Sequence, residues 1–159
     1  MTSRLRACLA ASIVATAFAP TAFADLGFPD YVKFPKQVVV NPDQKLIDEK
    51  VGEMEFVADK SGTMTARKGR HYSRWLDYKP AKGEPALGYD NGSETRISGA
   101  MIPLLTADGW QVVQQNEKKD GTTLHRVKDG KDAWAYLSMD APQGQVKLEM
   151  IEIAAAGPA

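Results

Sequence analysis

The chain has 159 residues, with 20 basic and 20 acidic side chains, two histidines and one cysteine. This balance excludes the basic excess that is typical of proteins that bind nucleic acid or anionic lipid. The cysteine is Cys8, so the sequence that follows it has no disulfide, no thiol nucleophile and no thiolate ligand for a metal. A chain of this length suits one domain with a modest core.

The first 24 residues follow the pattern of a secretory signal peptide. Arg4 and Arg6 precede the apolar stretch 7–19, and Ala22-Phe23-Ala24 places small residues before a cleavage site at Asp25. The apolar stretch has about 13 residues, fewer than the ~20 that a membrane-spanning helix needs, which argues against the alternative of an N-terminal anchor. We therefore expect cleavage between Ala24 and Asp25, export to the bacterial periplasm, and no stable membrane insertion afterwards.

The remaining chain is expected to form one domain over residues 25–153, followed by a disordered tail at 154–159. Loss of the two arginines leaves 18 basic and 20 acidic residues, a net charge of −2. Prolines favour an extended chain over residues 25–43. We expect a short strand at 36–40 and a single helical turn at 43–50.

Alternating side chains predict antiparallel strands between residues 54 and 78. The first strand starts near Met54, a turn at 59–62 leads to a second strand at 63–67, and Gly69 interrupts before the pattern resumes at 70–78. Two sets of side chains lie on opposite faces of the last run: Tyr72, Leu76 and Tyr78 on the expected core side, and His71, Ser73, Trp75 and Asp77 on the other. Residues 79–92 contain prolines and glycines and are expected to form a loop.

One helix is predicted over residues 92–108. Asn91 is expected to cap it, with Glu94 completing a capping box, and Gly109 to end it. Pro103 lies in the interior and predicts a kink. The apolar face expected to be buried on the sheet consists of Ile97, Met101, Leu104 and Leu105.

Four further strands are predicted after the helix, joined by short hairpin turns of which Asp129-Gly130 is the strongest signal. They cover residues 110–115, 122–128, 132–140 and 145–153. The fold class is therefore α+β: a mostly antiparallel sheet with one main helix packed on one face and the other face open to water.

Three segments resemble a domain of Gram-negative cell envelopes. They are residues 28–35 (FPDYVKFP), 107–113 (ADGWQVV) and 146–153 (VKLEMIEI). They are similar to the N-terminal domain that precedes the peptidoglycan-binding domain in some OmpA-family proteins. The resemblance implies a location in the cell envelope and implies no catalytic residues. Because the printed sequence ends soon after Ile153, we expect no peptidoglycan-binding domain and do not carry over wall anchoring.

The sequence predicts no catalytic, cofactor or metal site. His71 and His125 have no HxH or HExxH pattern around them, so a metal site would need Asp77 or Asp132 to join them across strands. No serine lies in a GxSxG motif, and the glycines form no phosphate-binding pattern. Carboxylate pairs that meet in space, for example from Glu53 and Asp77, stay open as an alternative.

A basic and aromatic stretch in the 70–78 strand is the best candidate for a ligand or partner surface. It contains Arg70, His71, Arg74 and Trp75. Strand alternation places Arg70 and Arg74 on the Tyr72 face and the other two on the opposite face, so one pair alone can line a flat site. We expect the Arg74 head in water at the sheet edge, and His71 and Trp75 exposed. Such a face suits a saccharide or an anionic polymer; the alternative is a solvated face with Trp75 over arginine stems.

These observations favour a non-enzymatic periplasmic domain with a cell-envelope binding or organising role, whose partner is an unidentified envelope protein or polymer. The alternative is a small hydrolase-like periplasmic enzyme that uses an unrecognised carboxylate or histidine site. A third possibility is a small inhibitor or a chaperone-like binder.

The signal peptide generates a direct test. Mass spectrometry of the protein recovered from the periplasm should find Asp25 at the N-terminus. Recovery of an intact Met1 in the membrane pellet would contradict the predicted cleavage and export.

Overall fold

The computed structural model describes residues 25–89 and 91–153. The predicted signal peptide and the predicted tail at 154–159 therefore lie outside the described residues. The elements are β1 Val38–Val40, β2 Ile47–Val57, β3 Met64–Tyr78, α1 Ser93–Ala107, β4 Gln111–Gln115, β5 Gly121–Lys128, β6 Lys131–Asp140, the 3-10 helix η1 Ala141–Gln143, and β7 Gln145–Ile153. Within the described ranges, no helix is long and apolar enough to cross a membrane.

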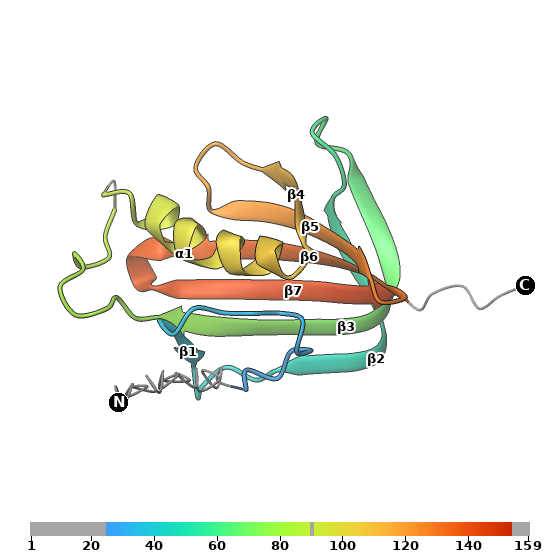
Figure 1. Ribbon diagram of the computed structural model, residues 1–159, viewed down its shortest axis with the longest axis horizontal. Coiled ribbons are helices and arrows are strands. Elements are labelled where there is room, and N and C mark those ends of the chain that lie inside the picture. The colour runs from blue at the N-terminus through green and yellow to red at the C-terminus, as the bar shows by residue number, and fades with distance from the viewer. Residues whose placement is uncertain (1–24, 90, 154–159) are drawn as a thin grey trace, which may run out of the picture.

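The strands form a seven-stranded sheet in the order β1-β3-β7-β6-β5-β4, and β2 also pairs with β3. Each pairing is antiparallel, and β1 and β2 occupy successive parts of the same edge of the long β3. Figure 1 shows the sheet curled into a half-barrel, with α1 in front of it. A mostly antiparallel sheet with one helix confirms the predicted composition of the fold.

The two faces of the sheet carry different side chains. One row of register partners, Tyr72, Met150, Ala135 and Leu124, belongs to the main hydrophobic core, and we call this side the core face. The neighbouring row lies on the opposite side, the back face, and consists of His71, Ile151, Trp134 and His125. The prediction that Tyr72, Leu76 and Tyr78 point into the core is confirmed.

The helix contributes Ile97, Met101 and Leu105 to the same core, and all three are fully buried. Leu104, predicted to be buried with them, is half-buried, because the buried positions follow an i, i+4, i+8 line that passes beside it. Gly92 is the N-cap in a left-handed conformation, and no side chain caps the helix, so the predicted capping box is wrong. Asn91 Oδ1 instead accepts a hydrogen bond from the Ser93 amide at 3.2 Å.

The β2–β3 hairpin bends where Gly52 and Gly69 face each other in register. A Cβ at Gly69 would lie 2.2 Å from the carbonyl oxygen of Glu152, and one at Gly52 would lie 2.5 Å from the Cβ of His71. No other residue type fits such approaches without moving the backbone. We call residues 52–69 the distal hairpin.

The distal hairpin packs over the back face. Met54 and Phe56 form a second buried cluster with Ile151, and the Phe56 ring stacks on Trp134 with 4.8 Å between ring centroids. Figure 1 shows the hairpin turning sharply at one end of the sheet. The bend therefore encloses this end of the back face in a small core of its own.

Two local predictions for β2 and β3 are wrong. The helical turn expected at 43–50 is absent, because β2 already begins at Ile47, which pairs with Ser73. The interruption expected at Gly69 does not occur, because the glycine bends β3 without breaking its pairing. The short strand expected at 36–40 is confirmed as β1, and the four strands after the helix are confirmed with ends within about one residue of those predicted.

We predict opposite effects for alanine substitutions at two glycines, one at the bend and one in the helix. Gly69→Ala should lower the free energy of unfolding by about 1–3 kcal/mol, because its methyl group would collide with the β7 backbone. Gly99→Ala is the matched control: it lies in α1 with nothing within 4 Å of an added Cβ, and it should raise stability by about 0.5–1 kcal/mol. Urea unfolding of both variants tests this pair, and a neutral Gly69→Ala would contradict the close approach.

Candidate functional site

The segment 25–34 crosses the core face without helix or strand structure, and three contacts hold it in place. Arg74 on β3 donates a hydrogen bond from Nη1 to the carbonyl oxygen of Leu26 at 3.0 Å. The Trp110 indole donates to the carbonyl oxygen of Tyr31 at 3.1 Å. The Tyr31 hydroxyl donates to the Glu152 carboxylate on β7. Backbone polar groups of an irregular segment need such partners when they are buried, and these contacts supply them.

Further contacts surround the Tyr31 ring. The Arg126 guanidinium lies 4.5 Å from the ring centroid and the Lys131 ammonium lies 5.1 Å from it, both within cation–π range. The Trp110 ring lies 6.2 Å away in a tilted arrangement. Burial, followed by the hydrogen bond to Glu152, raises the pKa of Tyr31 well above its ordinary value. The phenol is therefore a neutral donor that anchors the middle of the segment.

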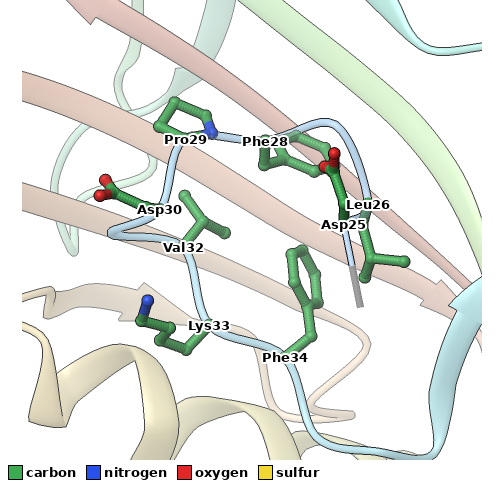
Figure 2. A pocket seen from close by; sticks show the side chains of 8 residues that line it. All are labelled: Asp25, Leu26, Phe28, Pro29, Asp30, Val32, Lys33 and Phe34. Atoms are coloured by element: carbon green, nitrogen blue, oxygen red, sulfur yellow. The ribbon is translucent and has the colours of Figure 1, made fainter. Parts of the chain in front are cut away.

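A recess of about 340 Å³ opens along this anchored segment. Its lining consists of Asp25, Leu26, Phe28, Pro29, Asp30, Val32, Lys33 and Phe34. Figure 2 shows Phe28, Val32 and Phe34 converging on the space that the loop encloses, whereas Asp30 and Lys33 point away from it. The Phe28 and Phe34 rings are 5.6 Å apart, so two aromatic rings form part of the wall. The volume falls in the lower part of the range of small-ligand pockets.

The lining of the recess combines apolar side chains with two aspartates and one lysine. It contains no serine, cysteine or histidine. Phe28, Val32 and Phe34 face the enclosed space, and Asp30 and Lys33 point away from it, which favours an apolar group in the interior. Asp25 Oδ1 accepts a hydrogen bond from the Gly27 amide at 2.9 Å, which turns this carboxylate back onto its own loop.

The two predicted arginines face the core side of the sheet and do not reach the recess interior as free cations. Arg70 binds Asp48 through two hydrogen bonds of 2.9 Å and lies over the Tyr72 ring at 5.0 Å. The hydrogen bond from Arg70 lowers the pKa of Asp48. Arg74 is half-buried under the N-terminal segment, so the expectation that its head lies in water at a sheet edge is wrong. The cause is that β3 is flanked by β1, β2 and β7, which leaves Arg74 beneath the crossing chain.

The other two predicted residues lie on the back face. His71 was expected to be exposed but retains only 8% of its accessible surface, because the bend at Gly52 lies directly over it. Its Nδ1 is 3.3 Å from Glu49 Oε2 and its Nε2 is 3.0 Å from Glu149 Oε1. Trp75 is half-buried. The four candidate residues are therefore divided between two faces, as the alternation predicts, and do not form one surface.

The second histidine has an acidic neighbour that the sequence proposed. His125 Nε2 lies 2.8 Å from Asp132 Oδ1, and its ring stacks on Trp134 at 3.9 Å. Asp77 does not join this pair; its Oδ1 accepts a hydrogen bond from Asn41 instead. In the described parts of the chain, no group of three or more His, Cys, Asp or Glu residues is arranged to hold a metal ion.

Sequence reasoning missed the recess because it treated residues 25–43 only as extended chain. A usable signal was present, since apolar residues gather there with neither helical nor strand periodicity. Such residues must either be buried by distant parts of the chain or line a site. They are Leu26, Phe28, Tyr31, Val32 and Phe34.

The Tyr31 anchor predicts a dependence of stability on alkaline pH. The folded protein holds the phenol proton more tightly than the unfolded chain, so Tyr31 stabilises the fold fully below about pH 10 and loses this contribution as the pH rises further. Tyr31→Phe should therefore reduce the fall in melting temperature above about pH 10. Tyr89→Phe, at a residue that is 76% exposed, is the control and should keep the original slope. Identical slopes in all three proteins would contradict the anchor.

Comparison with protein-family models, with curated proteins and with solved structures finds no match for this chain. The resemblance to the OmpA-associated domain therefore stays a prediction from the sequence. The function has to be argued from the geometry of the recess and of the surfaces around it.

Proposed function

We propose that this protein is a non-enzymatic periplasmic binding domain with an organising role in the cell envelope. In this proposal, the recess along residues 25–34 holds an apolar group of an envelope protein. The resemblance of residues 28–35 to the OmpA-associated domain supports the location, and those residues supply most of the recess lining. The predicted signal peptide supports export.

The observation that carries the proposal is a recess along residues 25–34, a segment that is held in place by hydrogen bonds at Leu26 and at Tyr31. Leu26 and Tyr31 are tied to β3, to Trp110 and to β7, so the walls between them are already in place before a ligand arrives. A pre-formed site loses less conformational entropy on binding than a loop that must first become ordered. Phe28 remains partly accessible, which gives an incoming group an aromatic surface to contact.

The proposal includes the predicted packing of α1 on the core face beside this segment. Ile97, Met101 and Leu105 share the main core with Val32 and Phe34, which supports that arrangement. In this arrangement, α1 and residues 25–34 cover the core face together, and α1 packs beside the chain that lines the recess.

The hydrolase-like alternative rests on a different observation. His71 and two glutamates gather on the back face, with Lys147 Nζ 3.0 Å from Glu149. Both ring nitrogens of His71 already face carboxylates, and the ring is buried. A substrate would have to displace the bend of the hairpin to reach it, which favours binding over catalysis as the function.

The recess can be tested with the uncharged apolar fluorophore N-phenyl-1-naphthylamine. The fluorophore should bind the wild-type protein saturably, and Phe28→Ala should weaken binding about tenfold, because the variant loses an aromatic wall. Tyr89→Ala removes an aromatic ring that is 76% exposed and lies outside the recess, and it should bind as the wild type does. Circular dichroism and thermal melts confirm that each variant is folded.

The same variants test the partner. Wild type, Tyr89→Ala and Trp75→Ala should capture the same protein from a cell-envelope extract, and Phe28→Ala should not. Loss of capture in Trp75→Ala alone would move the binding surface to the back face. Equal fluorophore binding by Phe28→Ala and wild type would contradict the recess as the site.

A further inference from the structure

We propose that the apolar group held by the recess along residues 25–34 is the last side chain of a partner polypeptide, whose terminal carboxylate binds Arg70 and Lys131. These two cations line a neighbouring cavity of about 330 Å³, which we call the polar pocket. The inference rests on the proposed function, because it names the part of the partner that enters the recess.

The polar pocket and the recess adjoin at the start of the N-terminal segment. Phe28 and Pro29 line both cavities. The Phe28 ring lies 5.6 Å from the Phe34 ring in the recess and 6.3 Å from the Tyr72 ring in the polar pocket. The Arg70 guanidinium lies over that tyrosine ring, 5.0 Å from its centroid. A ligand whose apolar group contacts Phe28 can therefore place an adjacent polar group in the polar pocket.

The acceptors in the polar pocket already have partners. Both carboxylate oxygens of Asp48 accept hydrogen bonds from Arg70. The Glu152 carboxylate accepts the hydrogen bond from Tyr31 and lies 3.4 Å from Lys131 Nζ. These two acids are thus engaged within the protein, which favours a ligand that brings acceptors of its own.

The donors in the polar pocket are only partly used. Arg70 binds Asp48 through Nε and Nη2, and within residues 25–89 and 91–153 no atom accepts a hydrogen bond from Nη1. A guanidinium has five N–H groups and an ammonium has three, so Arg70 and Lys131 both retain donors. Each of the two side chains is 48% exposed, which leaves these donors accessible. Two cations with unused donors suit an anionic acceptor such as a carboxylate.

The position of the two cavities favours a chain terminus as the source of this carboxylate. In a polypeptide, the last residue alone carries a backbone carboxylate on the same carbon as its side chain, and proteins capture such termini as specific recognition elements. The recess, at about 340 Å³, lies near the lower limit for small-ligand pockets and suits one side chain better than a long acyl chain. A terminal apolar residue would fill the recess and direct its carboxylate to Arg70 and Lys131.

Fluorescence anisotropy with two matched peptides tests this inference on the full domain. Both peptides consist of neutral residues, end in phenylalanine and carry a neutral coumarin label at a blocked N-terminus. One has a free C-terminal carboxylate and the other a C-terminal amide. The free acid should bind about tenfold more tightly than the amide, the difference expected from the charge-assisted hydrogen bonds that the amide cannot form.

Three variants locate the carboxylate. Arg70→Gln and Lys131→Gln should each lose most of the preference for the free acid, while their affinity for the amide stays unchanged. Lys68→Gln is the matched control, because Lys68 forms an ion pair of the same 3.4 Å length with Glu53, is 77% exposed and lines neither cavity. It should keep the full preference. N-phenyl-1-naphthylamine should bind all three variants, since the recess is unchanged in each.

The outcomes separate this inference from the proposed function. A wild-type protein that binds the fluorophore but binds the acid and the amide equally overturns the terminal carboxylate and leaves the recess as a binding site. A wild-type protein that binds neither fluorophore nor peptides overturns both. The inference is also overturned if either Arg70→Gln or Lys131→Gln keeps the full preference. Tighter binding of decanoate than of the free-acid peptide would overturn it too, because the carboxylate would then belong to a fatty acid.

Discussion

The close approach of Gly69 to the carbonyl oxygen of Glu152 is the constraint on which the distal hairpin and the recess along residues 25–34 both depend. It allows β3 to bend just beyond its last pair with β7, at Arg70, while it stays paired with β2, and the bend places Met54 and Phe56 over the back face. A single sheet of this size would otherwise leave that end of the back face open to water. With the bend, the sheet carries a second small core formed by its own hairpin.

Glu152 connects this bend with the recess on the opposite face. Its backbone limits the side chain that position 69 can carry, and its carboxylate accepts the hydrogen bond from Tyr31 that anchors the N-terminal segment. Lys131 Nζ lies 3.4 Å from the same carboxylate, which compensates part of its charge. The position of β7 at this residue therefore affects the hairpin and the recess walls together, although the two features lie on different sides of the sheet.

Local patterns in the sequence were sufficient for β1, α1, the four strands after the helix and the facing of the strands, but not for the start of β2 at Ile47. The alternation in β6 separates Ala133 and Ala135 from Trp134, and Asp129-Gly130 has positive φ at both residues, as its hairpin turn requires. The recess and the partners of His71 could not be found in this way, because they arise from contacts between residues far apart in the chain. Glu149 is 78 residues from His71, and no local pattern encodes such a distance. Gly69 stands out in the sequence as an interruption of the strand pattern. That it bends β3 instead of breaking it can be recognised only from its approach to β7, which begins much later in the chain.

The long separations also have a consequence for the order of folding. Tyr31 is 79 residues from its Trp110 contact and 121 residues from Glu152, whereas the β4–β7 hairpins connect near neighbours. Contacts between distant residues require large loops to close and generally form after local ones. The meander from β4 to β7 can therefore assemble first as a template, and the N-terminal segment docks onto it in a late step. A nascent or partly unfolded chain would then lack the recess even while most of its sheet is intact.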